Sequence, residues 1–378
     1  MKKKFVLVVS AINFFEGGPI SILKDCLSYL NKINNLQEFQ IIALIHHEDL
    51  FDKEAFSNLK FISFPKSRTS YLFRLYYEYW YFKKFAKNND VSFWLSLHDM
   101  SPRLANVSQA VYCHNPSPFN NINFSDLFIQ PTQFFFKLFY KYLYRININS
   151  NDYVIVQQNW IKKEFHKIFK LSNDKIIVAI PEVAKIPIEF LNKKVKNTDK
   201  CFFFPTYPRP FKNIEIICEA VNILNKERIN NFKVLITIDG TENKYSQSIL
   251  KRFEKEPNLE FVGLLSRQDV YRKYAETDCL IFPSKLETWG LPISEFKQYN
   301  KPMLVADLPY AKETVGSYDK AKFFNSKDPR QLASYMKDII TGNELNYEIT
   351  EPIKYSAPFA NGWAELFSIL LKEATIKQ

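Results

Sequence analysis

Short apolar segments alternate with helix-length amphipathic segments along most of this chain, and this alternation restricts its possible folds more than any other feature. Short apolar runs are typical of strands buried on both faces, and helical segments between them are typical of βαβ units in a parallel sheet. The first series of expected strands is Phe5–Val9, Gln40–Ile45, Phe93–Leu97, Ala110–Cys113, Tyr153–Val156 and Ile176–Ile180. The second series is Cys201–Phe204, Lys233–Ile238, Leu259–Val262, Cys279–Phe282, Pro302–Val305 and Lys322–Phe324. The pattern predicts an α/β protein with two parallel sheets.

The two series are separated by Leu191–Lys200, which is polar, charged and without hydrophobic periodicity, and which we interpret as a linker. We therefore predict one α/β domain over residues 1–187 and a second over residues 188–357. A chain of 378 residues is long enough for two domains of ordinary size. Helices are expected at Glu215–Leu224 and Arg267–Glu276, and a last one at Asn361–Glu373.

Composition excludes several other classes of protein. With 46% hydrophobic and 24% charged residues, the chain can form buried cores and is not intrinsically disordered. No apolar run approaches the roughly 18 residues of a membrane-spanning helix. The N-terminal apolar run is interrupted by Ser10, Asn13 and Glu16, which favours a first strand over a signal peptide. The five cysteines form no C-x-x-C pair, which indicates reduced thiols in a cytosolic protein.

Net charge points to the partners of the chain. A charge of +11 favours polyanions such as nucleic acid, anionic lipid or phosphorylated substrates. Two helix-length stretches, Tyr71–Lys87 and Pro131–Ile146, combine many Phe and Tyr residues with Lys and Arg. Such stretches can lie on an anionic membrane surface, with rings among the lipid headgroups. They can equally be core-facing helices whose lysines extend to solvent, so both interpretations stay open.

The segment from Phe282 to Asn300 reads FPSKLETWGLPISEFKQYN and contains Glu287 and Glu295. It follows an expected buried strand, and Gly290 with the following proline is typical of a helix start. Glu287 is thus expected on the loop after the strand and Glu295 in the first helical turn. Ligands bind at the carboxyl ends of strands in open α/β sheets, and helix starts attract phosphate. Two carboxylates beside a phosphate site suit a nucleotide-sugar. A solvated loop glutamate and a glutamate that favours the helix dipole are the alternative.

In its context, Glu287-x7-Glu295 resembles the E-x7-E signature of the retaining family-4 glycosyltransferases, the group 1 glycosyl transferases. The resemblance implies the GT-B architecture, in which two Rossmann-like domains face each other across a cleft. It also implies that the C-terminal helix, residues 358–378, packs back on the first domain. In that family Glu295 would bind the ribose and Glu287 the donor sugar, aided by backbone N–H groups of Gly290 and Leu291. Retention of anomeric configuration is implied in the same way.

Other positions fit the same resemblance. Gly17 and Gly18 follow the first expected strand, before a helix expected from Ile20, and are similar to the glycine loop that faces the donor diphosphate. Arg209 and Lys212 lie in the loop FFPTYPRPFKN, where fixed cations would stabilise a departing diphosphate. Two surface cations in a basic protein are the alternative.

His114 follows an expected strand and precedes Asn-Pro, and resembles the family's histidine that contacts the transferred sugar. A structural histidine is the alternative. His98 and Asp99 follow another strand and are expected on the acceptor side, or else cap a turn. Gly240 and Gly263 end strands of the second domain and resemble positions around the nucleotide base.

The sequence contains no D-x-D, the motif with which metal-dependent transferases hold a divalent cation on the diphosphate. H-E-x-x-H, P-loop and G-x-S-x-G motifs are absent as well. We therefore expect neither a metal nor a cofactor, and we expect Lys, Arg and helix N-termini to offset the charge of the diphosphate.

Together these features predict a glycosyltransferase that moves a hexose or deoxyhexose from a UDP- or GDP-linked donor to a surface-polysaccharide or lipid-linked glycan acceptor. We expect a cytoplasmic protein, peripheral at the inner face of a bacterial membrane, that does not bind nucleic acid. One rival is a nucleotide-sugar epimerase or hydrolase on the same fold, which would turn over without an acceptor. The other is a non-catalytic basic module for membrane or nucleic acid, whose binding would depend steeply on salt and not on Glu287 or Glu295.

Overall fold

The computed structural model describes residues 4–15, 17–34, 39–52, 54–116, 119, 142–191, 199–348, 350–351 and 353–376. These residues divide into two compact units. One unit comprises the described residues up to Glu182 together with those from Tyr355 onward, and the other runs from Val183 to Lys354. Most of the interpreted linker and most of Pro131–Ile146 lie outside the described residues.

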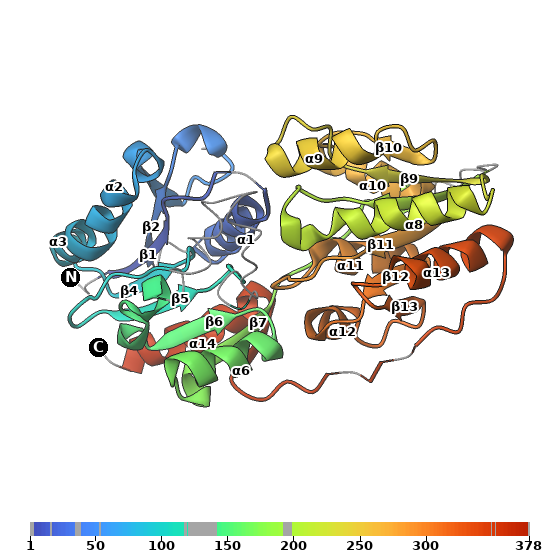
Figure 1. The fold of residues 1–378 in the computed structure, drawn as a ribbon. Helices are drawn as coiled ribbons and strands as arrows, with labels where there is room; N and C mark the ends of the chain where they lie inside the picture. Colours follow the sequence, from blue (N-terminus) through green and yellow to red (C-terminus); the bar gives the residue numbers. More distant parts are fainter. Residues whose placement is uncertain are drawn as a thin grey trace. The chain divides into compact units, whose positions relative to one another are not determined.

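The first unit contains an eight-stranded parallel sheet in the order β14-β7-β6-β5-β4-β1-β2-β3 (Figure 1). Its strands are β1 (Phe5–Ala11), β2 (Phe39–Ile45), β3 (Leu59–Ser63), β4 (Phe93–Ser96), β5 (Ser108–Tyr112), β6 (Tyr153–Val156), β7 (Ile176–Ile180) and β14 (Phe359–Asn361). Its helices are α1 (Gly17–Ile33), α2 (Tyr71–Tyr76), α3 (Phe82–Asn88), α6 (Asn159–Phe169) and α14 (Gly362–Ile376). A π-helical turn, Tyr77–Tyr81, joins α2 to α3, and 3₁₀ turns lie at Glu48–Leu50, Pro65–Arg68, Ile148–Ser150 and Asn173–Lys175.

Both faces of this sheet are covered, as the apolar strands require. Along β1, Leu7 and Val9 belong to one core cluster and Val6 and Val8 to another on the opposite face. This division follows from the two-residue period of a strand. Trp94 of β4 packs with the second cluster.

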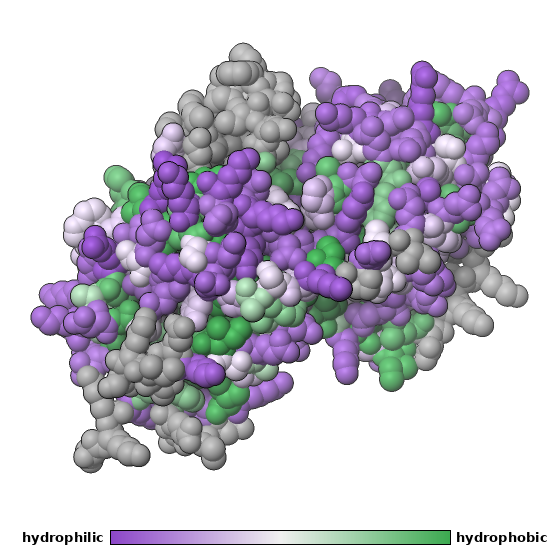
Figure 2. Space-filling view, turned by 90° about the horizontal axis from the view of Figure 1, so that it is seen from below, coloured by the Kyte–Doolittle hydropathy of each residue, from purple (hydrophilic) through white to green (hydrophobic). Residues whose placement is uncertain are grey.

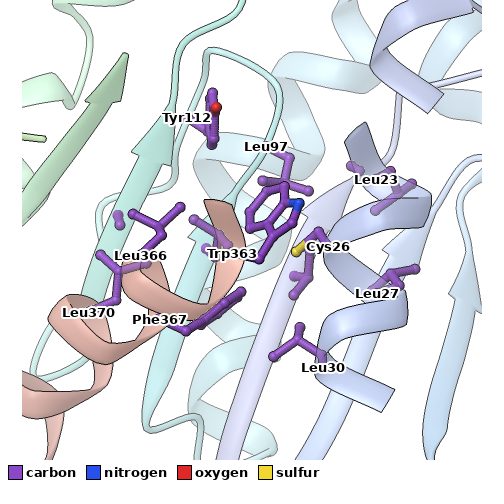
Figure 3. Packing of buried hydrophobic residues seen from close by; sticks show 14 of the residues in the cluster. Leu23, Cys26, Leu27, Leu30, Leu97, Tyr112, Trp363, Leu366, Phe367 and Leu370 are labelled. Carbon is purple, nitrogen blue, oxygen red and sulfur yellow. The ribbon is translucent and has the colours of Figure 1, made fainter. Parts of the chain in front are cut away.

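The last helix belongs to the first unit although it follows the second unit in sequence. Strand β14 pairs with β7, and α14 then contributes Trp363 and Phe367 to the core cluster that α1 also covers. Figure 3 shows side chains of α14 and α1 meeting over the sheet. The Phe367 ring stacks on Tyr29 of α1 at a centroid distance of 5.6 Å. The end of the chain is thus part of the first core.

The second unit contains a six-stranded parallel sheet in the order β10-β9-β8-β11-β12-β13. Its strands are β8 (Lys200–Phe204), β9 (Phe232–Ile236), β10 (Leu259–Phe261), β11 (Cys279–Phe282), β12 (Met303–Ala306) and β13 (Ala321–Phe324). Its helices are α7 (Ile188–Leu191), α8 (Ile214–Lys226), α9 (Lys244–Phe253), α10 (Arg267–Glu276), α11 (Leu291–Phe296), α12 (Pro309–Val315) and α13 (Pro329–Thr341), with 3₁₀ turns at Pro210–Lys212 and Lys297–Tyr299.

All the predicted strands are present, and α10 has the predicted bounds. The sequence did not predict β3 and β14. Strand β3 lies at the edge of its sheet and none of its residues is fully buried, so it lacks the continuous apolar run of a central strand. Strand β14 is only three residues long, at the opposite edge.

The surface is consistent with the composition. The face drawn in Figure 2 is mostly hydrophilic, with smaller hydrophobic areas between the polar ones. Within the described ranges, no helix is both long and apolar enough to cross a membrane. All five cysteines are buried and none forms a disulfide, as the sequence predicted.

Candidate functional site

The segment after β11 places two acidic residues at the carboxyl end of a central strand. Glu287 lies on the loop, and Gly290, at a φ of 89°, caps α11 in the left-handed region. A Cβ on Gly290 would approach Phe282 to 3.4 Å, so both backbone and packing favour glycine. Helix α11 begins at Leu291, which makes Glu295 its fifth residue. The expectation that Glu295 lies in the first turn is therefore wrong by about one residue.

Glu287 is paired with Lys212, which is 75 positions away in sequence. Lys212 Nζ donates to Glu287 Oε1 at 2.5 Å, and the two side chains are only 18% and 14% exposed. The pair joins the loop after β8 to the loop after β11, and these strands are neighbours in the sheet. Solvent screens the attraction between these two charges less than it does in a surface ion pair, while their burial costs free energy of desolvation.

Backbone and amide hydrogen bonds hold these two loops together. The Lys285 N–H donates to the Phe211 carbonyl at 2.7 Å. Asn213 adopts a left-handed conformation at the start of α8, and its amide donates to the carbonyls of Pro283 and Ser326. The Lys212–Glu287 geometry is thus fixed by the backbone as well as by charge.

Arg209 is not part of this pair. It starts the 3₁₀ turn Pro210–Lys212, and its guanidinium lies over the Tyr207 ring, 5.0 Å from the centroid. Among the described residues, Arg209 forms no ion pair. The structure places it in the same loop as Lys212 but in a different environment.

Glu295 points toward α10 and is 14% exposed. Its Oε2 accepts a hydrogen bond from the Tyr274 hydroxyl at 3.1 Å, and its Oε1 lies 3.9 Å from Arg267 Nη2. Burial raises the pKa of Glu295, whereas Arg267 and the Tyr274 hydrogen bond act to lower it. Two α10 residues thus support the ionised form of a mostly buried carboxylate.

Gly240 and Gly263 follow neighbouring strands, β9 and β10, as predicted. Gly263 has a φ of 69°, and a Cβ there would come within 3.0 Å of Asp239 Oδ2. The other oxygen of Asp239 accepts from the Thr241 N–H and hydroxyl, which lower the pKa of Asp239. The strand ends are therefore closely packed around one exposed carboxylate.

In the first unit, His114 follows β5 and stacks on Tyr112 at a centroid distance of 4.2 Å. Its two ring nitrogens are covered and have no hydrogen-bond partner in the described part of the chain. Burial lowers the pKa of His114 to about 4, although Asp99 acts to raise it. The imidazole is therefore neutral near pH 7.

Asp99, partly exposed and at a φ of 69°, holds the loop that carries His114. Its Oδ1 accepts from the His114 N–H at 2.6 Å, the Asn115 N–H at 3.2 Å and the Tyr144 hydroxyl at 2.8 Å. The sequence placed Asp99 on the acceptor side, and that role stays a prediction. What the structure adds is its contact with the His114 loop.

His98 is fully buried in a polar cluster with residues of three elements. Its Nε2 lies 3.1 Å from Ser10 Oγ and 3.1 Å from Glu78 Oε1, and its carbonyl accepts from Arg74 at 3.0 Å. Burial raises the pKa of Glu78 to about 8, against the opposing effect of Arg74. Contact between His98 and an acceptor would require this cluster to open, so its predicted acceptor role remains untested.

The glycine loop after β1 differs from its prediction in one respect. Helix α1 begins at Gly17, three residues before the expected start at Ile20. Gly17 has a φ of 68°, whereas a Cβ on Gly18 would meet only open space. Both glycines are exposed. The difference arises because Pro19 fits the first turn of a helix and does not have to precede it.

Four polar residues were missed from the sequence: Arg74, Glu78, Tyr144 and Tyr274. Arg74 and Glu78 lie four apart in a helical segment, a spacing that puts both on one face. Arg267, Tyr271 and Tyr274 likewise share one face of α10. These spacings could have indicated polar contacts, but their partners come from distant parts of the chain. In the described residues, no group of three or more His, Cys, Asp or Glu side chains is placed to hold a metal ion.

Comparison with known proteins agrees with this geometry. Residues 187–354, nearly the whole second unit, match the family described as glycosyl transferases group 1. The O-antigen chain mannosyltransferase RfbU of Salmonella typhimurium is 24% identical over 306 residues, covering 79% of this chain and 81% of that protein. The O-antigen chain mannosyltransferase B of Escherichia coli is 20% identical over 179 residues, covering 45% of this chain and 47% of that protein.

Solved structures extend the likeness to the first unit. A glycosyltransferase from Rickettsia africae has a TM-score of 0.65 at 15% identity, covering 99% of this chain and 98% of that chain. HepE of Anabaena, solved with UDP-glucose, has a TM-score of 0.64 at 13% identity, covering 89% and 90%. This chain therefore has the predicted GT-B fold, and its residues 187–354 match the family of the glycosyl transferases group 1.

Proposed function

We propose that this protein is a retaining, metal-independent glycosyltransferase that moves a hexose from a nucleotide-sugar to a surface-polysaccharide or lipid-linked glycan acceptor. The observation that carries the proposal is the Lys212–Glu287 pair, at the carboxyl ends of adjacent strands in the unit that matches the family, with Glu295 eight residues further along the chain. A carboxylate for sugar hydroxyls, a cation for phosphate and a second carboxylate for ribose are the groups that a nucleotide-sugar requires.

In this proposal the donor nucleotide binds the second unit. Glu295 accepts hydrogen bonds from the ribose hydroxyls, and Glu287 orients hydroxyls of the sugar. Lys212, with Arg209 nearby in sequence, stabilises the charge that develops on the departing diphosphate. When the donor binds, its phosphate takes over part of the contact that Lys212 otherwise makes with Glu287. Gly240 and Gly263 follow β9 and β10, at the strand ends where the base would bind.

The acceptor class is proposed from the sequence relatives, which act in O-antigen synthesis according to their names. Those two relatives are mannosyltransferases, and HepE was solved with UDP-glucose, so UDP- and GDP-linked hexoses are both candidate donors. A glycan on a lipid carrier would place the enzyme at the cytoplasmic face of a membrane.

The surface of α2 and the following π turn supports that location. This surface carries large hydrophobic side chains, each between 37% and 76% exposed to solvent. They are Tyr71, Leu72, Phe73, Tyr76, Trp80 and Tyr81. Lys83, Lys84 and Lys87 are exposed on the next turns. Aromatic rings beside lysines suit the headgroup layer of an anionic membrane. Arg74, Phe82 and Phe85 are buried on the opposite side, so the helix is amphipathic.

Thermal unfolding against UDP, GDP, ADP and CDP and their hexose conjugates tests the donor site. A ligand at about 100 times its dissociation constant should stabilise the protein by roughly 2.7 kcal/mol. We expect a shift with one nucleotide and its loss in Glu295→Ala. If folded protein responds to none of them, the transferase proposal fails. If the protein turned over the nucleotide-sugar equally fast with and without an acceptor, this would instead support an epimerase or hydrolase.

Sedimentation with vesicles of anionic phospholipid tests the membrane surface. We expect binding at low salt that weakens in Leu72→Gln/Trp80→Gln. Ile188→Gln serves as the matched control, because Ile188 is 73% exposed but lies in the second unit. Equal binding by the two variants would contradict this surface as the docking site.

A further inference from the structure

The carboxylate of Glu295 has both oxygens directed at one face of α10. Tyr274 donates to Oε2 at 3.1 Å, and Arg267 Nη2 lies 3.9 Å from Oε1. Residues 267 and 274 are seven apart, or two helical turns, and so lie on the same side of α10. Arg267 is itself oriented by its Nε, which donates to the Tyr271 hydroxyl at 2.6 Å. Helix α10 thus contacts each oxygen of Glu295 with a different side chain.

Tyr274 cannot move away from this contact. Its side chain is fully buried, and its ring packs against Phe203 of β8, Phe296 of α11 and Tyr299 at centroid distances of 5.7, 5.4 and 5.7 Å. A buried hydroxyl needs a partner, and the partner of this one is Glu295. Burial keeps the pKa of Tyr274 well above its usual range. The hydroxyl therefore stays protonated and donates a hydrogen bond to Glu295. The donor position is therefore as rigid as the core.

A carboxylate that binds two neighbouring hydroxyls must present free lone pairs in a fixed plane. Each carboxylate oxygen accepts about two hydrogen bonds, so the Tyr274 contact leaves acceptor capacity on both oxygens of Glu295. A glutamate also loses rotamer freedom when it is ordered, and a side chain ordered in advance does not lose this on ligand binding. The Tyr274 hydroxyl of α10 supplies that ordering.

We propose that Tyr274 is a positioning residue that orients Glu295 for the ribose hydroxyls of the donor nucleotide, with Arg267 assisting at the other oxygen. The inference rests on the proposed donor site on the second unit. If Tyr274 has this role, loss of its hydroxyl weakens recognition of the ribose hydroxyls and leaves the rest of nucleotide binding unchanged.

Calorimetric titration with UDP or GDP, whichever stabilises the protein, and with the matching 2′,3′-dideoxynucleotide measures this recognition as a ratio of dissociation constants. We expect the wild type to prefer the ribonucleotide by roughly 10- to 100-fold, the range for hydrogen bonds to a charged group. In Tyr274→Phe the ratio should fall to about 3-fold or less, with unchanged affinity for the dideoxynucleotide. Arg267→Gln should lower the ratio by a smaller factor.

Tyr299→Phe is the matched control. Tyr299 belongs to the same aromatic cluster, and its hydroxyl donates to the Tyr271 carbonyl at 2.8 Å and not to Glu295. It should keep the ratio of the wild type. Arg267→Gln keeps the test valid if Tyr274→Phe does not fold, since Arg267 is half exposed and outside the core.

The outcomes of this experiment distinguish the positioning role of Tyr274 from the existence of the donor site. A wild-type preference for the ribonucleotide that persists in Tyr274→Phe and Arg267→Gln would overturn the positioning role and leave the donor site intact. A wild type that binds no nucleotide would overturn both. If it binds ribo- and dideoxynucleotides equally, the assignment of Glu295 to the ribose is wrong, and the positioning role with it.

Discussion

Lys212 Nζ lies 2.5 Å from Glu287 Oε1, with both side chains mostly buried, so the two groups proposed to bind different parts of the donor form an ion pair with each other. Each group therefore holds the other in place. Removing one partner leaves the other as an uncompensated charge at low exposure, which is costly.

A double-mutant cycle with Lys212→Met and Glu287→Gln measures this pair. We expect a coupling free energy of about 1–3 kcal/mol by chemical denaturation, because contacting residues couple in that range. The matched control is Lys337–Glu227, at 2.8 Å but nearly half exposed on both sides, which should couple by less than about 1 kcal/mol. Equal coupling in the two pairs would show that burial of the first pair has no energetic effect.

Replacing the cations of the loop after β8 should lower activity. With the donor hexose identified, Lys212→Met should lower kcat by about 10²–10³, the usual effect of losing one group that stabilises transition-state charge. Arg209→Met should lower it less, since Arg209 lies over Tyr207 and not beside Glu287. A larger loss in Arg209→Met would reverse the roles proposed for the two cations.

Glu78 should make stability depend on pH. Its folded pKa is about 8, and its usual value is 4.5, so between these values the folded protein holds a proton that the unfolded chain has released. The unfolded state binds fewer protons there, and the free energy of unfolding must fall as pH rises. Glu78→Gln should remove this slope and be more stable than wild type by about 3 kcal/mol near pH 7. Denaturation at pH 5, 6, 7 and 8 measures the difference, and parallel curves for both proteins would contradict it.

Asp99 should control the loop that carries His114. Asp99→Ala removes an acceptor of two backbone N–H groups and of the Tyr144 hydroxyl, which also donates to the Asn115 carbonyl, and we expect it to cost about 1–3 kcal/mol. Asp99→Asn keeps an acceptor oxygen but not the charge that raises the pKa of His114. In that variant the pKa of His114 should fall below about 4. Histidine-selective NMR titration, with His114→Gln to assign the signal, reads this out, and an unchanged pKa would refute the coupling.

The C-terminal helix should be needed for the first unit to fold. Trp363 of α14 is 6% exposed in the core cluster, and Trp363→Ala should destabilise the protein by about 3–5 kcal/mol. Trp80→Ala is the control, since Trp80 is 64% exposed and should change stability by no more than about 0.5 kcal/mol. Thermal unfolding compares the two. Similar midpoints would mean that α14 adds little to that core.

Metal independence is a further expected outcome. Lys212 and Arg209 are proposed to carry the charge compensation that a divalent ion supplies in metal-dependent transferases. Activity should therefore persist after dialysis against EDTA, measured as sugar transfer with and without added Mg²⁺ or Mn²⁺. Loss on chelation with recovery on adding one ion would overturn this part of the proposal.

The sequence alone predicted both parallel sheets, because buried central strands need continuous apolar runs and the helices between them have their own period. It also predicted that Glu287 and Lys212 lie in loops after strands, since strand ends are local features, whereas the roles of Glu287, Glu295 and Lys212 in the site stay predictions. It did not predict β3, whose edge position requires no continuous apolar run, or the start of α1 at Gly17.

What only the tertiary structure decided is which side chains meet. The Lys212–Glu287 pair, the Tyr274–Glu295 hydrogen bond and the Asp99 contacts with the His114 loop join residues that are 15 to 75 positions apart. No local pattern specifies such partners, because they depend on the order of strands in the sheet and on the depth of burial. Burial also sets the ionisation of Glu78 and His114, since the cost of removing a charge from water depends on everything packed around it.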